Sequence, residues 1–278
     1  MDQWQTGFVV SQGTKLHYYR SAGSKPPLVL IHGITDDGMC WAPVAEELAN
    51  DYDVIMIDVR GHGKSEAPNA GYNYETIANE ITGLINELEL GHPIVMGHSM
   101  GAMITLTLAG LYPDLPKAII LEDPPAFWNV KPPTQEDLDH RSGMVAWFND
   151  VKRLTRDDLL ESVRATSPSW SEAELGPWAD AKHRFSLKII QLVESPDAVP
   201  ANFPLLLQQI TCPALLITAD HELGAILTGE DVAALLRSVQ HLERVHIPGA
   251  GHNIRREQFT RYMEVINLFL AKLKKITG

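Results

Sequence analysis

Residues 93–102 read Pro-Ile-Val-Met-Gly-His-Ser-Met-Gly-Ala and place Ser99 at the centre of a Gly-x-Ser-x-Gly pentapeptide. The apolar run Ile94–Met96 predicts a buried strand before the serine, and Met100–Leu111 predicts a helix after it. A serine between a strand and a helix lies at a sharp turn that exposes its hydroxyl at the sheet edge. The two glycines of the pentapeptide lack side chains that would collide where strand and helix pass closely. The stretch therefore predicts a nucleophilic serine on an α/β sheet.

Length and composition restrict the class of protein. The chain has 278 residues, which suffices for one large α/β domain or for a domain with an insertion. Its 45% hydrophobic and 21% charged residues are ordinary for a globular protein. The net charge of −12 disfavours nucleic acid and anionic membranes as partners.

The compartment is also predicted from sequence. Two cysteines, Cys40 and Cys212, are too few for a disulfide scaffold and favour a reducing environment. The N-terminal residues Met1–Gln5 lack the basic and apolar regions of a signal peptide, and no apolar run is long enough to cross a bilayer. We therefore expect a cytoplasmic protein with no membrane partner; its oligomeric state is left open.

Short apolar segments alternate with helical patterns along most of the chain. We expect eight strands, at Phe8–Val10, Leu16–Tyr19, Leu28–Ile31, Val54–Ile57, Ile94–Met96, Ala118–Leu121, Ala214–Thr218 and Arg244–Ile247. We expect helices at Trp41–Ala49, Tyr74–Leu88, Met100–Leu111, Asp231–Ser238 and Gln258–Lys274. Buried strands joined by helices pack as a mostly parallel sheet covered on both faces. Ligands of such sheets collect at the carboxyl ends of the strands.

One long segment departs from this alternation. From Asp123 to about Pro204 no buried strand is predicted, and prolines stand at both ends of the segment. It holds four of the six tryptophans, Trp128, Trp147, Trp170 and Trp178. We therefore expect a core formed by residues 1–123 and 205–278, and a helical cap formed by residues 124–204. Its tryptophans, and the phenylalanines Phe127, Phe148, Phe185 and Phe203, would build the cap's own core, a substrate pocket, or both.

A serine hydroxyl needs a base to remove its proton and a third group to orient that base. His252 is the best candidate base, because it lies in a glycine-rich loop just beyond the last predicted strand. The acid is expected after the penultimate strand, where Asp220 and Glu222 are both available. Metal and cofactor sites are not expected, since His221-Glu222 lacks the second histidine of a zinc helix, at the position of Ala225.

Taken together, these motifs resemble the α/β-hydrolase family over nearly the whole chain. The matching stretches are His32-Gly33, Asp58-Val-Arg-Gly-His-Gly-Lys-Ser65, Gly97-His-Ser-Met-Gly101, Leu215–Glu222 and Gly251-His252. The resemblance implies an eight-stranded hydrolase sheet with helices on both faces.

The resemblance also implies roles for single residues. The family's acid commonly ends a Gly-x-x-Asp step, which here reads Ala219-Asp-His-Glu222, so the matching acid is Glu222 although the step departs twice from the pattern. Asp220 is its main rival. Asp123 is a further candidate, because some members place their acid after the preceding strand. The oxyanion hole would use the backbone N–H groups of Ile34 and Met100.

We therefore expect a serine hydrolase that cleaves small, mainly apolar carboxylic esters through an acyl-enzyme. A lactonase or a carbon–carbon bond hydrolase of the same fold would use the same residues. A ligand receptor with low turnover is the alternative outside the enzymes. A serine at position 99 argues against the branches of the family that attack with aspartate.

Overall fold

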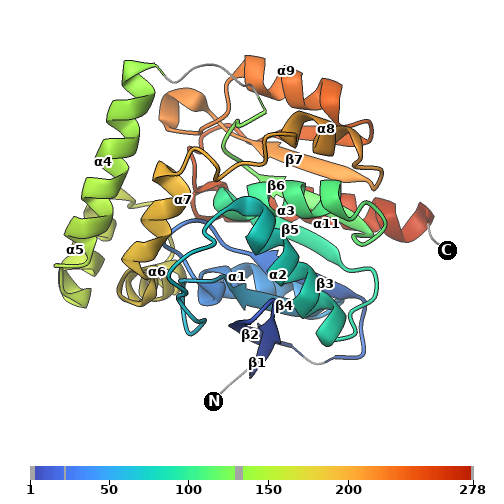
Figure 1. Cartoon of the computed structure of the whole chain (residues 1–278), viewed down its shortest axis with the longest axis horizontal. Coiled ribbons are helices and arrows are strands. Elements are labelled where there is room, and N and C mark those ends of the chain that lie inside the picture. Colours follow the sequence, from blue (N-terminus) through green and yellow to red (C-terminus); the bar gives the residue numbers. More distant parts are fainter. Residues whose placement is uncertain (1–3, 22, 129–133, 277–278) are drawn as a thin grey trace.

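The computed structural model describes residues 4–21, 23–128 and 134–276. Its eight strands form one sheet in the order β1-β2-β4-β3-β5-β6-β7-β8 (Figure 1). The strands are β1 (Gln5–Ser11), β2 (Thr14–Arg20), β3 (Pro27–Ile31), β4 (Asp53–Asp58), β5 (Ile94–His98), β6 (Ala118–Glu122), β7 (Ala214–Thr218) and β8 (Leu242–His246). The pairs β1–β2 and β2–β4 are antiparallel, and every other pair is parallel. The predicted sheet is confirmed, although β1 begins three residues, and β2 and β8 each two residues, before the predicted strand.

Helices connect the parallel strands and cover the sheet. They are α1 (Ala42–Leu48), α2 (Tyr74–Glu87), α3 (Met100–Leu111), α4 (Gln135–Val151), α5 (Arg156–Thr166), α6 (Glu172–Arg184), α7 (Ile190–Glu194), α8 (Phe203–Gln208), α9 (Gly229–Ser238), α10 (Ile254–Glu257) and α11 (Phe259–Ile276). Short 3-10 turns lie at η1 (Gly38–Trp41), η2 (Leu187–Ile189) and η3 (His221–Leu223). In the described ranges, no helix has the length and apolarity needed to span a membrane.

Each central strand is buried on both faces, and its side chains alternate between two hydrophobic cores. On β3, Leu28 and Leu30 pack in the core that includes α1 and α11, whereas Val29 and Ile31 pack in the core that includes α2, α3 and α9. This alternation explains why the central strands are continuous apolar runs in the sequence. Two layers of helices cover both faces of the sheet. A site is therefore expected where the strands end, beyond these layers.

The turn between β5 and α3 depends on two close backbone approaches. A Cβ placed on Gly97 would lie 2.2 Å from the Gly101 carbonyl oxygen, and one on Gly101 would lie 2.1 Å from the Ile31 carbonyl oxygen. Between the two glycines, Ser99 adopts φ +53°, a left-handed conformation that a non-glycine residue rarely adopts. The predicted reason for glycine at both positions is therefore confirmed.

The long connection from β6 to β7 carries α4 to α8, and the part of it that the structure describes contains no strand. Helices α4 to α7 gather at one side of the sheet, on the left in Figure 1. By contrast, α8 packs against α3 and so joins the helical layer over the sheet. The division into a core and a cap at residues 124–204 stays a prediction, although α4 to α7 have the helical character expected of it.

Gly101→Ala tests the close approach at the turn. Its added methyl group would meet backbone rather than a movable side chain, so we expect unfolding stability to fall by about 1–3 kcal/mol or more. The matched control is Gly143→Ala in α4, where a Cβ meets nothing within 4 Å. Alanine there should gain about 1 kcal/mol, because it is the better helix former. Denaturant unfolding would give the free energy of unfolding of both variants. A Gly101→Ala variant as stable as the unchanged protein would contradict this account.

Candidate active site

A cavity of about 440 Å³ lies at the carboxyl ends of the parallel strands, between the sheet and α4 to α6. Both Ser99 and His252 line it. The remaining lining residues are Gly33, Ile34, Thr35, Asp36, His98, His140, Met144, Trp147, Phe148, Val163, Thr166, Ser167, Trp170, Trp178, Lys182, Gly224, Ile226, Asn253 and Arg256. The cavity therefore combines the predicted nucleophile and base with side chains from the helical segment after β6.

Ser99 is 7% exposed, and a hydrogen bond of its backbone N–H fixes its position. Its N–H donates to the Glu122 carbonyl at 2.9 Å, which joins the turn to the end of β6. Met100 begins α3, so its N–H has no acceptor inside the helix and lies at the positive end of the helix dipole. The Ile34 N–H donates to none of the described residues. Both predicted oxyanion donors thus belong to residues that line the cavity or adjoin Ser99.

The His252 ring is oriented by a buried carboxylate. Its Nδ1 lies 2.7 Å from Oδ2 of Asp123, and the Asp123 side chain is fully buried. That carboxylate also accepts the N–H groups of Ile226 at 2.8 Å and Leu227 at 3.2 Å. Because an ionised carboxylate only accepts hydrogen bonds, Nδ1 carries the proton and Nε2 is left as the basic nitrogen.

This contact corrects the expected acid. Glu222 lies in η3 with an exposed side chain, and no hydrogen bond or ion pair of that side chain occurs among the described residues. Asp220 is committed elsewhere, since its Oδ2 accepts the Gly249 N–H at 2.7 Å and its Oδ1 lies 2.9 Å from His246 Nε2. The carboxylate on His252 comes instead from the end of β6, the third candidate of the sequence.

A signal for Asp123 existed in the sequence. The step after β7 departs from the family pattern at both of its defining positions, which weakens the case for an acid there. Glu122-Asp123 supplies two carboxylates at the carboxyl end of the neighbouring strand β6. Asp123 also adopts φ +42°, which marks a strained residue, but only the structure reveals that conformation.

The ring of His98 packs beside that of His252 and contacts its backbone. The two ring centroids are 4.7 Å apart, and His98 Nε2 lies 3.0 Å from the His252 carbonyl oxygen. Burial, together with the nearby positive charge of Arg255, lowers the pKa of His98 well below its ordinary value. A neutral His98 with its proton on Nε2 donates to that carbonyl and so holds the backbone of His252. Sequence reasoning did not single out this residue.

Six fully buried or nearly buried charged side chains lie at one wall of the cavity, and three of them, Asp36, Lys182 and Arg256, line it. We call Asp36, Glu122, Glu174, Lys182, Arg255 and Arg256 the buried ion cluster. Asp36 is its centre, with Lys182 Nζ at 2.9 Å, Arg256 Nη2 at 2.9 Å and Arg255 Nη2 at 3.4 Å. Burial alone would raise the pKa of the Asp36 carboxyl, but attraction by Arg256, Lys182 and Arg255 holds it well below its ordinary value.

The buried ion cluster joins three parts of the chain. Glu174 in α6 accepts from Arg256 Nε at 3.1 Å, and Glu122 at the end of β6 contacts Arg255 Nη1 at 3.2 Å. Lys182 adds a second contact from α6 to the loop after β3. The three acidic and three basic groups balance, so the wall carries no net charge when all are ionised. No signal in the sequence brought these residues together.

The expectation that aromatic residues of the helical segment line a pocket holds for some of them. Trp147, Phe148, Trp170 and Trp178 line the cavity. Trp128 does not, because its ring is in the hydrophobic core and its Nε1 donates to the Asp231 carbonyl at 3.0 Å. The other predicted aromatic residues, Phe127, Phe185 and Phe203, are also absent from the lining. Those three tryptophans and Phe148 give the cavity an aromatic surface on the side of the helical segment.

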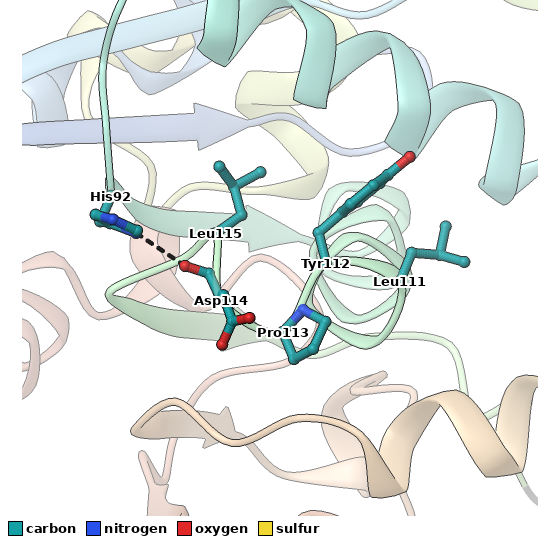
Figure 2. Close-up of a pocket in the computed structure, with 6 residues that line it drawn as sticks. All are labelled: His92, Leu111, Tyr112, Pro113, Asp114 and Leu115. Atoms are coloured by element: carbon teal, nitrogen blue, oxygen red, sulfur yellow. Dashed lines mark hydrogen bonds between the residues drawn. The ribbon is translucent and has the colours of Figure 1, made fainter.

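A second hollow, of about 420 Å³, lies at the opposite ends of the strands (Figure 2). Its lining comes from the residues before β5 and from those between α3 and β6, and His92 Nδ1 lies 2.8 Å from the Asp114 carbonyl oxygen there. It brings no nucleophile and base together. Across the residues that the structure describes, no group of three or more His, Cys, Asp or Glu side chains could hold a metal ion.

A family model described as the alpha/beta hydrolase fold matches residues 26–255. The chain belongs to the alpha/beta hydrolase fold family. Structural comparison agrees, because the crystal structure of an E-2-(acetamidomethylene)succinate hydrolase superposes with a TM-score of 0.79 at 23% identity. That superposition covers 96% of this chain and 99% of the other. A thermophilic esterase from Thermogutta terrifontis superposes at a TM-score of 0.71 with 25% identity, over 97% of this chain and 99% of the esterase.

Two hydrolases of known activity are similar in sequence. A 2-(acetamidomethylene)succinate hydrolase from Mesorhizobium japonicum is 39% identical over 104 residues, which is 37% of this chain and 37% of that protein. An N-formylmaleamate deformylase from Pseudomonas putida is 27% identical over 251 residues, which is 89% of this chain and 90% of that protein. These similarities support a hydrolase acting on a small molecule.

Replacing Asp123 and Glu222 in turn tests which of these two carboxylates orients His252. We expect Asp123→Asn to lower ester hydrolysis on the order of 10³-fold or more, because the amide no longer holds the His252 tautomer and imidazolium. Glu222→Gln is the matched control and should change the rate less than about twofold, since its side chain is exposed. The rates are compared at equal folded concentration, judged by circular dichroism. A large loss in Glu222→Gln with little loss in Asp123→Asn would refute the role of Asp123.

Proposed function

We propose that this protein is a serine hydrolase that cleaves carboxylic esters through an acyl-enzyme intermediate. Ser99 is the nucleophile, His252 the base and Asp123 the group that orients the base. The observation that carries the proposal is the 2.7 Å contact between His252 and the buried Asp123, with His252 and Ser99 in one cavity. A strained serine turn and an oriented histidine have no evident structural use together, whereas nucleophilic catalysis requires both.

The proposed reaction has two steps that use the same residues. His252 Nε2 accepts the Ser99 hydroxyl proton as the oxygen attacks the ester carbonyl carbon, and it then gives this proton to the departing alcohol oxygen. Water next attacks the acyl-enzyme, with His252 first accepting a proton and then returning one to Ser99. Asp123 stays ionised throughout and stabilises the imidazolium that forms. The products are a carboxylic acid, an alcohol and the unchanged enzyme.

Negative charge develops on the carbonyl oxygen in both steps and needs preorganised donors. The N–H groups of Ile34 and Met100 are the proposed donors, because both approach the Ser99 side of the cavity from the ends of β3 and β5. Loss of one such donor typically costs about 3 kcal/mol of transition-state stabilisation. The positive end of the α3 dipole adds to the same effect.

The cavity supports a small, uncharged substrate. Trp147, Phe148, Trp170 and Trp178 supply apolar and aromatic surface for an acyl or alcohol group. The cationic residues Lys182 and Arg256 also line the cavity, but each is already paired with Asp36. Because the buried ion cluster is balanced, a substrate carboxylate would enter without a dedicated counter-charge.

Hydrolysis of the amide bond in a small acid is a second candidate. The relatives from Mesorhizobium japonicum and Pseudomonas putida, whose names specify such compounds, favour it. Lactone opening, carbon–carbon bond hydrolysis and ligand reception with low turnover remain alternatives that would use the same cavity. Esters are preferred here because the balanced charges and aromatic lining suit neutral compounds.

Ser99→Ala tests the nucleophile. We expect hydrolysis of p-nitrophenyl acetate to fall on the order of 10⁴-fold or more, since no other hydroxyl occupies the turn before α3. Ser167→Ala is the matched control, because Ser167 lines the same cavity away from that turn, and it should retain activity within about threefold. Substantial turnover by the Ser99→Ala variant would rule out an acyl-enzyme formed on Ser99.

A pair of esters with one leaving group tests the substrate class. We expect p-nitrophenyl butyrate to be hydrolysed at least about 10-fold more efficiently than the anionic p-nitrophenyl hydrogen succinate, because the carboxylate finds no unpaired cation. Values of kcat/KM for both esters, beside a panel of lactones and amides, provide the measurement. Faster hydrolysis of the succinate would favour the acidic substrates instead.

A further inference from the structure

The loop after β3 holds a conformation that its own sequence disfavours. Thr35 is β-branched, yet its φ is +66°, in the left-handed region that such residues rarely occupy. A residue in this region persists only when surrounding contacts over-determine its position. The loop therefore depends on partners outside itself.

The orientation of the Ile34 N–H is set within the same loop. In a trans peptide the N–H of Ile34 points opposite to the carbonyl of Gly33. That carbonyl accepts the Asp36 N–H at 3.1 Å and lies 2.8 Å from His32 Nδ1. Asp36 consequently governs where the proposed oxyanion donor points.

Lys182, in α6 of the helical segment, donates hydrogen bonds to both Thr35 and Asp36 of this loop. Its Nζ donates to the Thr35 carbonyl at 3.2 Å and to Oδ1 of Asp36 at 2.9 Å, across more than 140 residues of sequence. The side chain is 2% exposed, and its ammonium lies 4.7 Å from the centre of the Trp178 ring. Burying an ammonium group is costly unless its donors are satisfied, so a lysine here has a specific task.

We propose that Lys182 is a positioning residue for the oxyanion hole. It fixes the strained Thr35 and its neighbour Asp36 and thereby aims the Ile34 N–H at the carbonyl oxygen of the substrate. The inference rests on the proposed function and extends it, because it makes α6 part of the machinery that stabilises the transition state. The helical segment then does more than enclose the substrate.

Lys182→Met tests the inference with a neutral side chain of similar length. We expect kcat/KM for p-nitrophenyl acetate to fall about 10- to 100-fold, mainly through kcat, because a misdirected donor affects the transition state. Inhibition by phenylboronic acid, whose serine adduct is a tetrahedral anion, should weaken by the same factor. A merely structural role would lower stability without moving these two constants together.

The matched control is Lys152→Met. Lys152 belongs to the same helical segment and donates to the His183 carbonyl at 2.9 Å, outside the loop after β3. It should keep the kcat/KM and boronate inhibition of the unchanged protein within about twofold. Lys182→Gln retains one donor and serves in place of Lys182→Met if that variant does not fold.

Thr35→Gly provides the decisive second variant. Glycine adopts positive φ without strain, so the loop no longer needs the lysine to hold it. The double variant Thr35→Gly, Lys182→Met should therefore recover much of the activity that Lys182→Met loses. No recovery, or normal kcat/KM and boronate inhibition in Lys182→Met, would overturn the inference. Failure of the proposed function is distinguishable, because the unchanged protein would then hydrolyse no ester.

Discussion

The contact between Gly101 and the end of β3 is the constraint on which the site depends. Only a residue without a side chain lets α3 approach the Ile31 carbonyl so closely. That approach brings the turn carrying Ser99 beside the loop after β3, which holds Ile34. The N–H of Ser99 then donates to the Glu122 carbonyl and joins the turn to β6, the strand that ends immediately before Asp123. The proposed nucleophile, oxyanion donors and acid consequently follow three neighbouring strands, β3, β5 and β6.

The buried ion cluster extends this frame beyond the sheet. Asp36 receives cations from α6 and from α10, the short helix that follows His252. Removing one partner from such a cluster would leave a buried charge uncompensated, which typically costs about 3–5 kcal/mol. The cluster therefore couples the helical segment to the loops that carry the base and the oxyanion donor. Each of its three cations, Lys182, Arg255 and Arg256, is paired with an acidic group of the cluster.

Local pattern predicted most of the architecture. The central strands are continuous apolar runs because both of their faces are buried, and this property is visible without coordinates. The least accurate strand was β1, where the predicted Phe8–Val10 falls short of Gln5–Ser11 at both ends, because its largely exposed residues give a weaker signal than the central strands. Trp128 was a candidate for either the pocket or a hydrophobic core, and the structure packs its indole in the core, where it donates to the Asp231 carbonyl. A tryptophan's position along a segment does not specify which face it presents.

The sequence by itself determined the central strands of the sheet and the glycine turn at Ser99, because these depend on patterns of residues close together in the chain; it also predicted His252 as the base from its place after the last strand. The tertiary structure decided which carboxylate meets His252, since the ends of β6 and β7 both reach that region. Asp123 holds that position because the Ile226 and Leu227 N–H groups aim its carboxylate, whereas Glu222 points to solvent. Likewise, Lys182 and Asp36 meet across more than 140 residues, and only folding brings such distant charges into contact.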